Sequence, residues 1–116
     1  MKRAVMAAVM HLSESERRAR PDAELGYDEF LRVPALSAGM YVVPAGGVDH
    51  QQPHQEDEVY VVLAGAARFT GGSETVDVRP GSVLFVPAYE EHRFHDVIAD
   101  LEVLVVFGPA ETELSG

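Results

Sequence analysis

The 116-residue sequence predicts a single all-β domain, a sandwich or a barrel, and two features of the chain support this prediction. From Leu36 onward, short runs rich in β-branched and aromatic residues alternate with breaks that contain Gly or Pro. Most of these breaks are too short to hold the crossover helices that parallel neighbouring strands require. A parallel α/β sheet is therefore not expected.

The first part of the chain is expected to form an arm ahead of the barrel. The apolar segment 4–10 follows two basic residues, but it is short for a signal peptide and no clear cleavage site follows it. We therefore expect a first strand or a short buried segment there. Residues 13–20 predict a helix of one or two turns, because Ser13 and Glu16 have capping-box spacing and a proline closes the segment. Residues 22–33 are mixed in pattern and are expected to be irregular.

Seven short strands are expected in the barrel, separated by turns that contain Gly or Pro. Gly71 and Gly72 lie between two of these strands and predict a tight hairpin turn. The chain is expected to be one domain, with an arm at 1–35, the barrel at 36–109 and a tail at 110–116. The expected strands are Leu36–Val43, Val59–Leu63, Ala66–Thr70, Thr75–Val78, Ser82–Val86, His92–Val97 and Leu101–Phe107.

The charge and composition of the chain exclude several classes of function. Acidic residues number 19 against 9 basic residues, a net charge of −10, so a nucleic acid backbone would be repelled. No apolar stretch approaches the length of a membrane span. The chain has no cysteine, which excludes disulfides, thiolate metal sites and cysteine nucleophiles and fits a reducing compartment. We therefore expect a cytoplasmic protein that binds neither nucleic acid nor a membrane.

A polar cluster immediately before one apolar strand contains the first candidate site residues. If the backbone is extended there, His50, Gln52 and His54 point to one face, because alternate residues of a strand share a face. Residues 55–57 then turn the chain, and their acidic side chains are expected to be solvated. Glu58 opens the next strand, so His54 and Glu58 can face each other across the turn.

A second segment with a candidate site residue spans 81–96. Pro87 ends one strand and His92 begins the next. In a regular strand His92, Phe94 and Asp96 share one face. His95 lies on the opposite face and is expected at the surface or at a subunit interface.

Together the two segments offer the donors of a metal site. His54, His92 and Glu58 make two imidazoles and one carboxylate, the set found in facial-triad non-haem iron sites, and the same donors accept Zn, Mn, Ni or Co. Gln52 offers a weaker amide oxygen, which leaves three roles open: metal ligand, distant ligand, or hydrogen-bond partner of a metal-bound water. His50 is expected at the barrel mouth, or as a replacement ligand if the strand contains a bulge.

The two segments resemble the two sequence motifs of the cupin superfamily. The family motifs match in order and in every interval, but three positions differ: Gln52 replaces a metal-binding His, Tyr89 replaces a Gly, and Asp96 replaces an Asn. The matching positions are Gly46, Gln52, His54, Glu58 and Gly65 in the first motif, and Gly81, Pro87, Tyr89, His92 and Asp96 in the second.

The resemblance implies a fold and a metal centre. The implied fold is a small single-domain cupin, a double-stranded β-helix or jelly-roll barrel like that of RmlC, with a short N-terminal helical segment. The implied ligand positions are Gln52, His54, Glu58 and His92, holding one divalent metal ion per chain, with iron preferred. Small single-domain cupins commonly form dimers, so the resemblance also implies a homodimer.

The donor set and the resemblance lead us to expect a metal-dependent enzyme acting on a small organic molecule. Oxygenase chemistry is favoured over Lewis-acid isomerase, lyase or cyclase chemistry because of the facial-triad donors. Glu58 or His50 would move a proton, and the Tyr60 hydroxyl would donate to a bound substrate. A non-catalytic binding or sensing module that uses the same cavity is the alternative.

Overall fold

The computed structural model describes residues 9–18, 26–49 and 53–112 of the chain. Most of the N-terminal apolar segment lies outside these ranges, and so do His50 and Gln52. The expectations for those residues therefore stay predictions.

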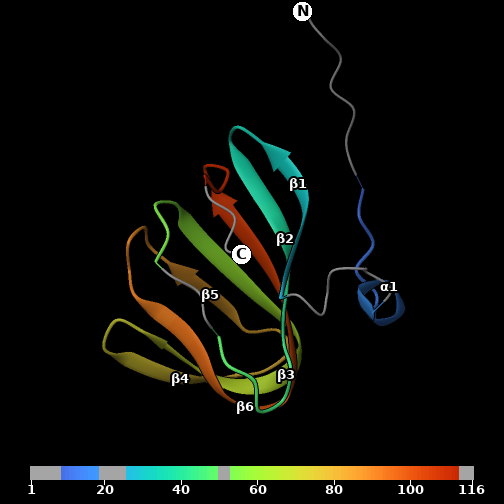
Figure 1. The fold of residues 1–116 in the computed structure, drawn as a ribbon, viewed down its shortest axis with the longest axis vertical. Helices are drawn as coiled ribbons and strands as arrows, with labels where there is room; N and C mark the ends of the chain where they lie inside the picture. The colour runs from blue at the N-terminus through green and yellow to red at the C-terminus, as the bar shows by residue number, and fades with distance from the viewer. Residues whose placement is uncertain (1–8, 19–25, 50–52, 113–116) are drawn as a thin grey trace, which may run out of the picture.

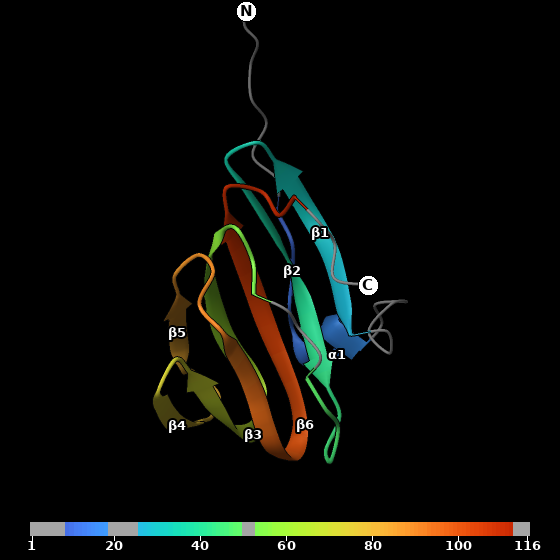
Figure 2. The same ribbon diagram turned by 60° about the vertical axis from the view of Figure 1, so that its left-hand side comes forward.

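The described part of the chain is an antiparallel sheet with one short helix, which confirms the all-β prediction (Figure 1). The sheet follows the order β1-β2-β6-β3-β4, and β5 pairs separately with β3. Figure 2 shows β4 and β5 on the side of the molecule away from β1 and α1. The elements are α1 (Glu14–Arg18), β1 (Tyr27–Val33), β2 (Leu36–Val43), β3 (Asp57–Gly71), β4 (Glu74–Val78), β5 (Val83–Val86) and β6 (His92–Gly108).

Two of the long strands correct the sequence prediction, which divided each of them in two. β3 continues through Gly65, whose φ of 98° bends the strand, and the register with β6 shifts on either side of Ala64 and Ala66. The first half of β3 pairs with β5 and the second half with β4. Glycine therefore marks a bend in the barrel wall here and not the end of a strand.

The segment expected to be irregular contains β1, which pairs with β2 at the edge of the sheet. Its first five residues are all partly exposed, so no buried face alternates with a solvated one. A register shift between Glu29 and Leu31 also interrupts the two-residue period. These two features explain why the sequence pattern did not predict the strand.

The short helix α1 lies against the outside of the barrel. Arg17 Nε donates to Glu102 Oε1 at 2.7 Å, and both side chains are largely buried. Glu102 lies between two inward-facing residues of β6, so this contact attaches the helix to the outer face of that strand. The one-turn helix agrees with the expectation for this segment. Among the described residues, no helix has the length and apolarity needed to cross a membrane.

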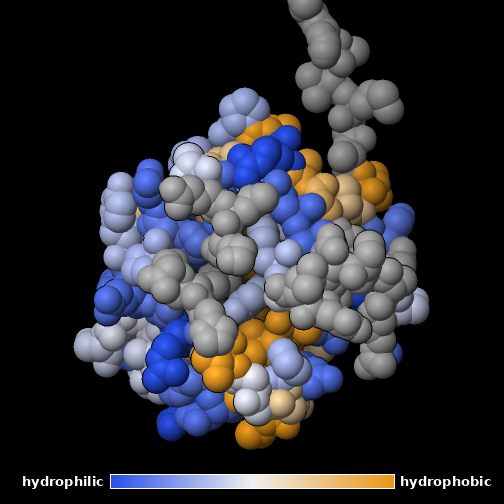
Figure 3. Space-filling view, in the orientation of Figure 1, coloured by the Kyte–Doolittle hydropathy of each residue, from blue (hydrophilic) through white to orange (hydrophobic). Residues whose placement is uncertain are grey.

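The core lies inside the curled sheet and follows the two-residue period of the strands. Alternate residues of β6 from Leu101 to Phe107 are buried, as are Tyr60 and Val62 of β3. The same inward row of β3 begins with Glu58, so strand geometry places a carboxylate among core side chains. The outer surface is mainly hydrophilic on the face that Figure 3 shows, with apolar patches near its lower edge.

Candidate metal centre

Three metal-ligating side chains meet inside the barrel. His54 lies in the loop before β3, Glu58 is the second residue of β3, and His92 is the first residue of β6. One potential ligand atom from each lies within 4.8 Å of the other two. Along the β3–β6 ladder Glu58 pairs with Phe107, far from His92. The curl of the barrel therefore brings opposite ends of the ladder together.

The orientation of His92 is set from both sides of its ring. Nδ1 lies 2.8 Å from the carbonyl oxygen of Glu90, and because a carbonyl only accepts, Nδ1 carries a hydrogen. Nε2 lies 3.0 Å from the Tyr60 hydroxyl and 3.2 Å from Glu58 Oε1. Burial and the Glu58 charge raise the pKa of Tyr60, so its hydroxyl stays protonated and donates. Nε2 is therefore the nitrogen directed at the centre.

His54 is held by contacts that join three parts of the chain. Its Nδ1 lies 3.1 Å from Glu111 Oε2. Its ring packs edge-on against Phe107, with 4.8 Å between ring centroids, and lies 6.1 Å from the ring of His92. Its carbonyl oxygen accepts from the Tyr89 amide at 2.7 Å. The loops that carry the two histidines are therefore hydrogen-bonded to each other.

The centre contains two carboxylates in an environment where a charge is costly. Glu58 and Glu111 are each 1% exposed, and no oxygen of either makes a well-aligned hydrogen bond to the described residues. Each carboxylate instead faces an imidazole at little more than 3 Å. A buried carboxylate costs several kcal/mol unless a positive charge compensates it. Protons on the imidazoles, or a metal ion, would supply that charge.

The two carboxylates raise the pKa of the imidazoles beside them. Burial alone would lower the pKa of His54, but the Glu111 carboxylate beside its ring and the charge of Glu58 raise that pKa above its ordinary value. Burial also lowers the pKa of His92. The Glu58 carboxylate beside the ring and the Glu90 carbonyl outweigh that effect and raise the pKa. A divalent ion held by His54, Glu58 and His92 would also compensate the carboxylate charge. The donor set therefore fits a metal.

A layer of aromatic rings forms one wall of the centre. The Tyr60 and Phe94 rings lie 4.9 Å apart between centroids, and the Phe69 and Phe94 rings are separated by the same distance. Phe69 in turn lies 6.2 Å from the ring of His92. These rings exclude water from the imidazole and strengthen its electrostatic contacts.

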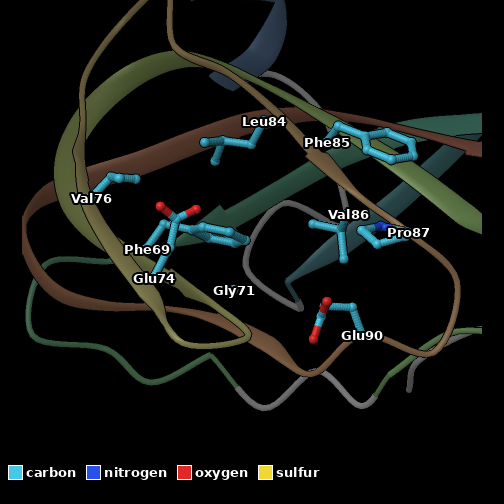
Figure 4. A pocket seen from close by; sticks show the side chains of 9 residues that line it. All are labelled: Phe69, Gly71, Glu74, Val76, Leu84, Phe85, Val86, Pro87 and Glu90. Carbon is cyan, nitrogen blue, oxygen red and sulfur yellow. The ribbon is translucent and has the colours of Figure 1, made fainter.

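A cavity of about 320 Å³ opens between β4 and β5, beside this aromatic wall (Figure 4). Leu84 and Val86 of β5 pair directly with Tyr60 and Glu58, so they share the inward face of the sheet with these residues. Phe69 lines the cavity, and its ring lies 6.2 Å from the ring of His92. The lining residues are Phe69, Gly71, Glu74, Val76, Leu84, Phe85, Val86, Pro87 and Glu90. The volume suits a small organic ligand.

The structure brings together the predicted residues His54, Glu58, His92 and Tyr60. It describes neither His50 nor Gln52.

Two expectations near the site are wrong. Glu56 is not solvated: it is 3% exposed and accepts from the amide and the hydroxyl of Thr112. Asp96 does not share the inward face of His92 and Phe94, because its φ of 50° interrupts the alternation and leaves it exposed. His95 lies on the outer side as expected, where its ring bonds to Thr70 and Asp96.

Sequence reasoning missed two residues of the centre. Glu111 lies in the expected tail, and no pattern there distinguishes a buried carboxylate from a solvated one. Tyr27 lies in the segment expected to be irregular. Its hydroxyl is buried and has no hydrogen-bond partner among the described residues, and burial together with Glu111 raises its pKa. Tyr27 is therefore a further donor available to a bound ligand.

Comparison with known proteins places the fold in a family. Residues 39–107 match the family model described as the cupin domain. An uncharacterized protein of Streptomyces coelicolor is 48% identical over 99 residues, which cover 85% of this chain and 91% of that protein.

Two solved structures illustrate the likeness in fold. A cupin 2 conserved barrel domain protein from Rhodopseudomonas palustris matches with a TM-score of 0.67 at 21% identity, over 75% of this chain and 62% of that chain. The DMSP lyase DddQ from Ruegeria pomeroyi DSS-3 matches with a TM-score of 0.64 at 22% identity, over 84% of this chain and 54% of that chain. This chain therefore spans less than two thirds of either one.

Proposed function

Since the chain belongs to the cupin domain family, we propose that it is a metal-dependent enzyme acting on a small organic molecule. The observation that carries the proposal is the buried cluster of His54, Glu58 and His92, whose ligand atoms lie within 4.8 Å of one another. The Glu58 carboxylate has no aligned hydrogen bond among the described residues, which supports a cation as its partner. Gln52 is a proposed fourth ligand.

The residues around the cluster have separate proposed roles. A bound divalent ion would supply Lewis-acid polarisation of a substrate oxygen or, if redox-active, electrons for O₂ chemistry. Tyr60, whose raised pKa keeps its hydroxyl protonated, is proposed to donate a hydrogen bond to the substrate when a metal engages Nε2 of His92. Glu58 or His50 is proposed to accept the proton removed from the substrate. The cavity beside Phe69, whose lining is part apolar and part polar, would hold the body of the substrate.

Oxygenase chemistry with iron is our first choice, because two imidazoles and one carboxylate are the facial-triad donors. Lewis-acid chemistry, as in an isomerase, lyase or cyclase, is the second choice, and zinc, manganese, nickel or cobalt would serve it. The match to a lyase of the same fold supports this second choice only as an analogy.

A non-catalytic binding or sensing module is the alternative from a different class of function. The observation that favours it is the imidazole–carboxylate pairing, in which protons on His54 and His92 can balance both buried charges without a metal. Such a protein would bind a small molecule in the same cavity and release it unchanged.

We also propose a cytoplasmic homodimer. The family resemblance supports the dimer, and the absence of cysteine from the sequence is compatible with a reducing compartment. Light scattering on the purified protein tests the assembly, and a monomer at micromolar concentration would contradict it.

The metal content of the purified protein tests the proposal directly. Elemental mass spectrometry is applied to protein purified without a metal-affinity tag, alongside His54→Ala and His92→Ala. The matched control is His95→Ala, which removes an imidazole that bonds to Thr70 and Asp96 outside the centre. We expect near-stoichiometric metal in the wild type and in the control, and its loss in both site variants.

The identity of the metal then separates the chemistries. Stoichiometric iron would support the oxygenase and lead to a screen for O₂ consumption. Zinc, manganese or nickel would shift the proposal to Lewis-acid chemistry. If the wild type holds no metal even after reconstitution, and the site variants behave like it, the enzyme proposal is overturned in favour of the binding module.

A further inference from the structure

Glu111 lies beyond the strands of the barrel, yet it reaches the metal centre. It follows β6, outside the residues 39–107 that match the cupin family model. Its side chain is among the most buried in the described chain, at 1% exposed. Its Oε2 lies 3.1 Å from Nδ1 of His54. A residue outside the family's two motifs therefore contacts a proposed metal ligand.

The backbone of Glu111 is fixed by neighbours from the first two strands. Its amide donates to Ser37 Oγ of β2 at 2.9 Å, and its carbonyl accepts from Arg32 of β1 at 2.6 Å. The next residue, Thr112, donates its amide and its hydroxyl to Glu56 at 3.2 and 2.9 Å. We call residues 109–112 the C-terminal strap. These contacts hold its carboxylate in one place.

The Glu111 carboxylate is costly to bury. Within the described residues neither of its oxygens makes an aligned hydrogen bond, and the His54 ring at 3.1 Å is the partner that can compensate its charge. Its contact with His54 does have a consequence for that ring. A carboxylate accepts, so it selects the form of His54 with a hydrogen on Nδ1 and directs the Nε2 lone pair elsewhere.

His92 shows the same arrangement with a different acceptor. Its Nδ1 donates a hydrogen bond to the Glu90 carbonyl, and its Nε2 faces Glu58. Both histidines of the cluster thus have an acceptor at Nδ1, which is the usual way in which proteins orient a metal-binding imidazole. For His54 the acceptor is an anion, which also makes the imidazole a stronger donor to a metal.

We propose that Glu111 is a positioning residue, which fixes the ring and the tautomer of His54 so that Nε2 binds the metal. The C-terminal strap is then part of the metal centre. This inference rests on the proposed function, because it concerns the same metal.

The test measures metal affinity and ring protonation together. Zn²⁺ is titrated into the metal-free full-length protein in competition with a chelator, for the wild type and Glu111→Gln. The neutral amide is nearly isosteric, and we expect the Zn²⁺ dissociation constant to rise about 10- to 100-fold. The control is Glu102→Gln, which alters a largely buried carboxylate that bonds to Arg17 on the outer face of β6. We expect its affinity to change less than about threefold, since it leaves Glu111 in place.

Nitrogen-15 NMR of the histidine rings supplies the second readout. In the Zn²⁺-loaded wild type, His54 should carry its hydrogen on Nδ1. A hydrogen on Nε2 would overturn the proposal without any variant, so the test survives if Glu111→Gln does not fold. An unchanged Zn²⁺ affinity in folded Glu111→Gln would also overturn it.

Failure of the metal site itself gives a different pattern. If the wild type binds no Zn²⁺, or any other divalent metal, the proposed function fails. The tautomer of His54 in the metal-free protein in alkaline buffer then decides the positioning role alone. Nδ1–H in the wild type, lost in Glu111→Leu, whose side chain has no acceptor, supports the role, and any other result contradicts it.

Discussion

Tyr89 shows at the scale of one residue how this chain departs from its family. It stands where the cupin motif has glycine, and its φ is 68°, in the left-handed region that favours glycine. Its side chain is 71% exposed, so packing does not compensate for the strain. Its amide donates to the His54 carbonyl, so the strained residue joins the two loops of the centre. The backbone geometry of the motif is therefore retained without its glycine.

The strain at Tyr89 is measurable by replacement. Tyr89→Gly should be more stable than Tyr89→Ala by about 1 kcal/mol, because alanine keeps the left-handed penalty and glycine removes it. Chemical denaturation of both variants gives the difference in the free energy of unfolding. Equal stabilities, or a more stable alanine variant, would show that the position carries no backbone strain.

The residues of the centre differ in how far the sequence could predict them. His54, Glu58 and His92 were predictable because motif spacing and strand alternation act over short stretches of chain. Glu111 and Tyr27 were not, because their roles depend on contacts between segments far apart in sequence. Their neighbours in the sequence provide no period from which burial could be read.

At the scale of the element, the bend in β3 is the feature that shapes the barrel. Gly65 has a φ of 98°, and an added Cβ would lie 2.4 Å from the Asp100 carbonyl oxygen and 2.7 Å from the Leu101 Cα. The backbone of β6 therefore passes directly over this glycine. A side chain at the bend would separate the two longest strands.

Gly81 offers a matched control for the bend. Its φ is 95°, close to that of Gly65, but a Cβ there would meet no atom within 4 Å. Gly81→Ala should cost about 1–2 kcal/mol from backbone strain alone. Gly65→Ala should cost at least about 3 kcal/mol, because a steric clash with β6 is added. Thermal and chemical unfolding of the two variants would detect the difference, and equal losses would argue against the close approach.

The sequence predicted that these segments form strands better than it predicted where each strand begins and ends. β2 matches its predicted range of 36–43, because its run of strand-forming residues is uninterrupted and a proline lies close to each end. β3 was divided at Gly65, since a sequence pattern does not distinguish a glycine that bends a strand from one that ends it. β6 was divided at residues 98–100, where three exposed residues in a row interrupt the alternation. Propensity acts locally, whereas the continuity of a strand depends on the partners that pair with it.

At the scale of the whole molecule, the buried charges of the centre connect stability to pH. In the metal-free protein the pKa of His54 and that of His92 are raised by the carboxylates beside them. A raised folded-state pKa means that folding favours the protonated ring. This contribution is fully present below the ordinary value of about 6.5 and is lost as pH rises through the folded-state values.

We therefore expect the metal-free protein to lose stability as the pH rises above about 6.5. Urea denaturation across this range measures the slope, and His54→Gln with His92→Gln should flatten it. Bound metal should reverse the trend, since metal competes with protons for the same nitrogens and binds more tightly at higher pH. A metal-free stability that is flat or rises over this range would contradict the charge balance.

The position of β6 has a consequence for how the chain folds during synthesis. β6 pairs with both β2 and β3, so it joins the two sides of the sheet, yet it is synthesised after all the other described strands. The β1–β2 and β3–β4 hairpins can form early, but their inner edges have no partner until residue 108 has been made. Exposed strand edges attract other chains, and pairings distant in sequence form slowly. The nascent chain is therefore expected to depend on chaperones, and slower translation or a lower growth temperature should increase the soluble yield.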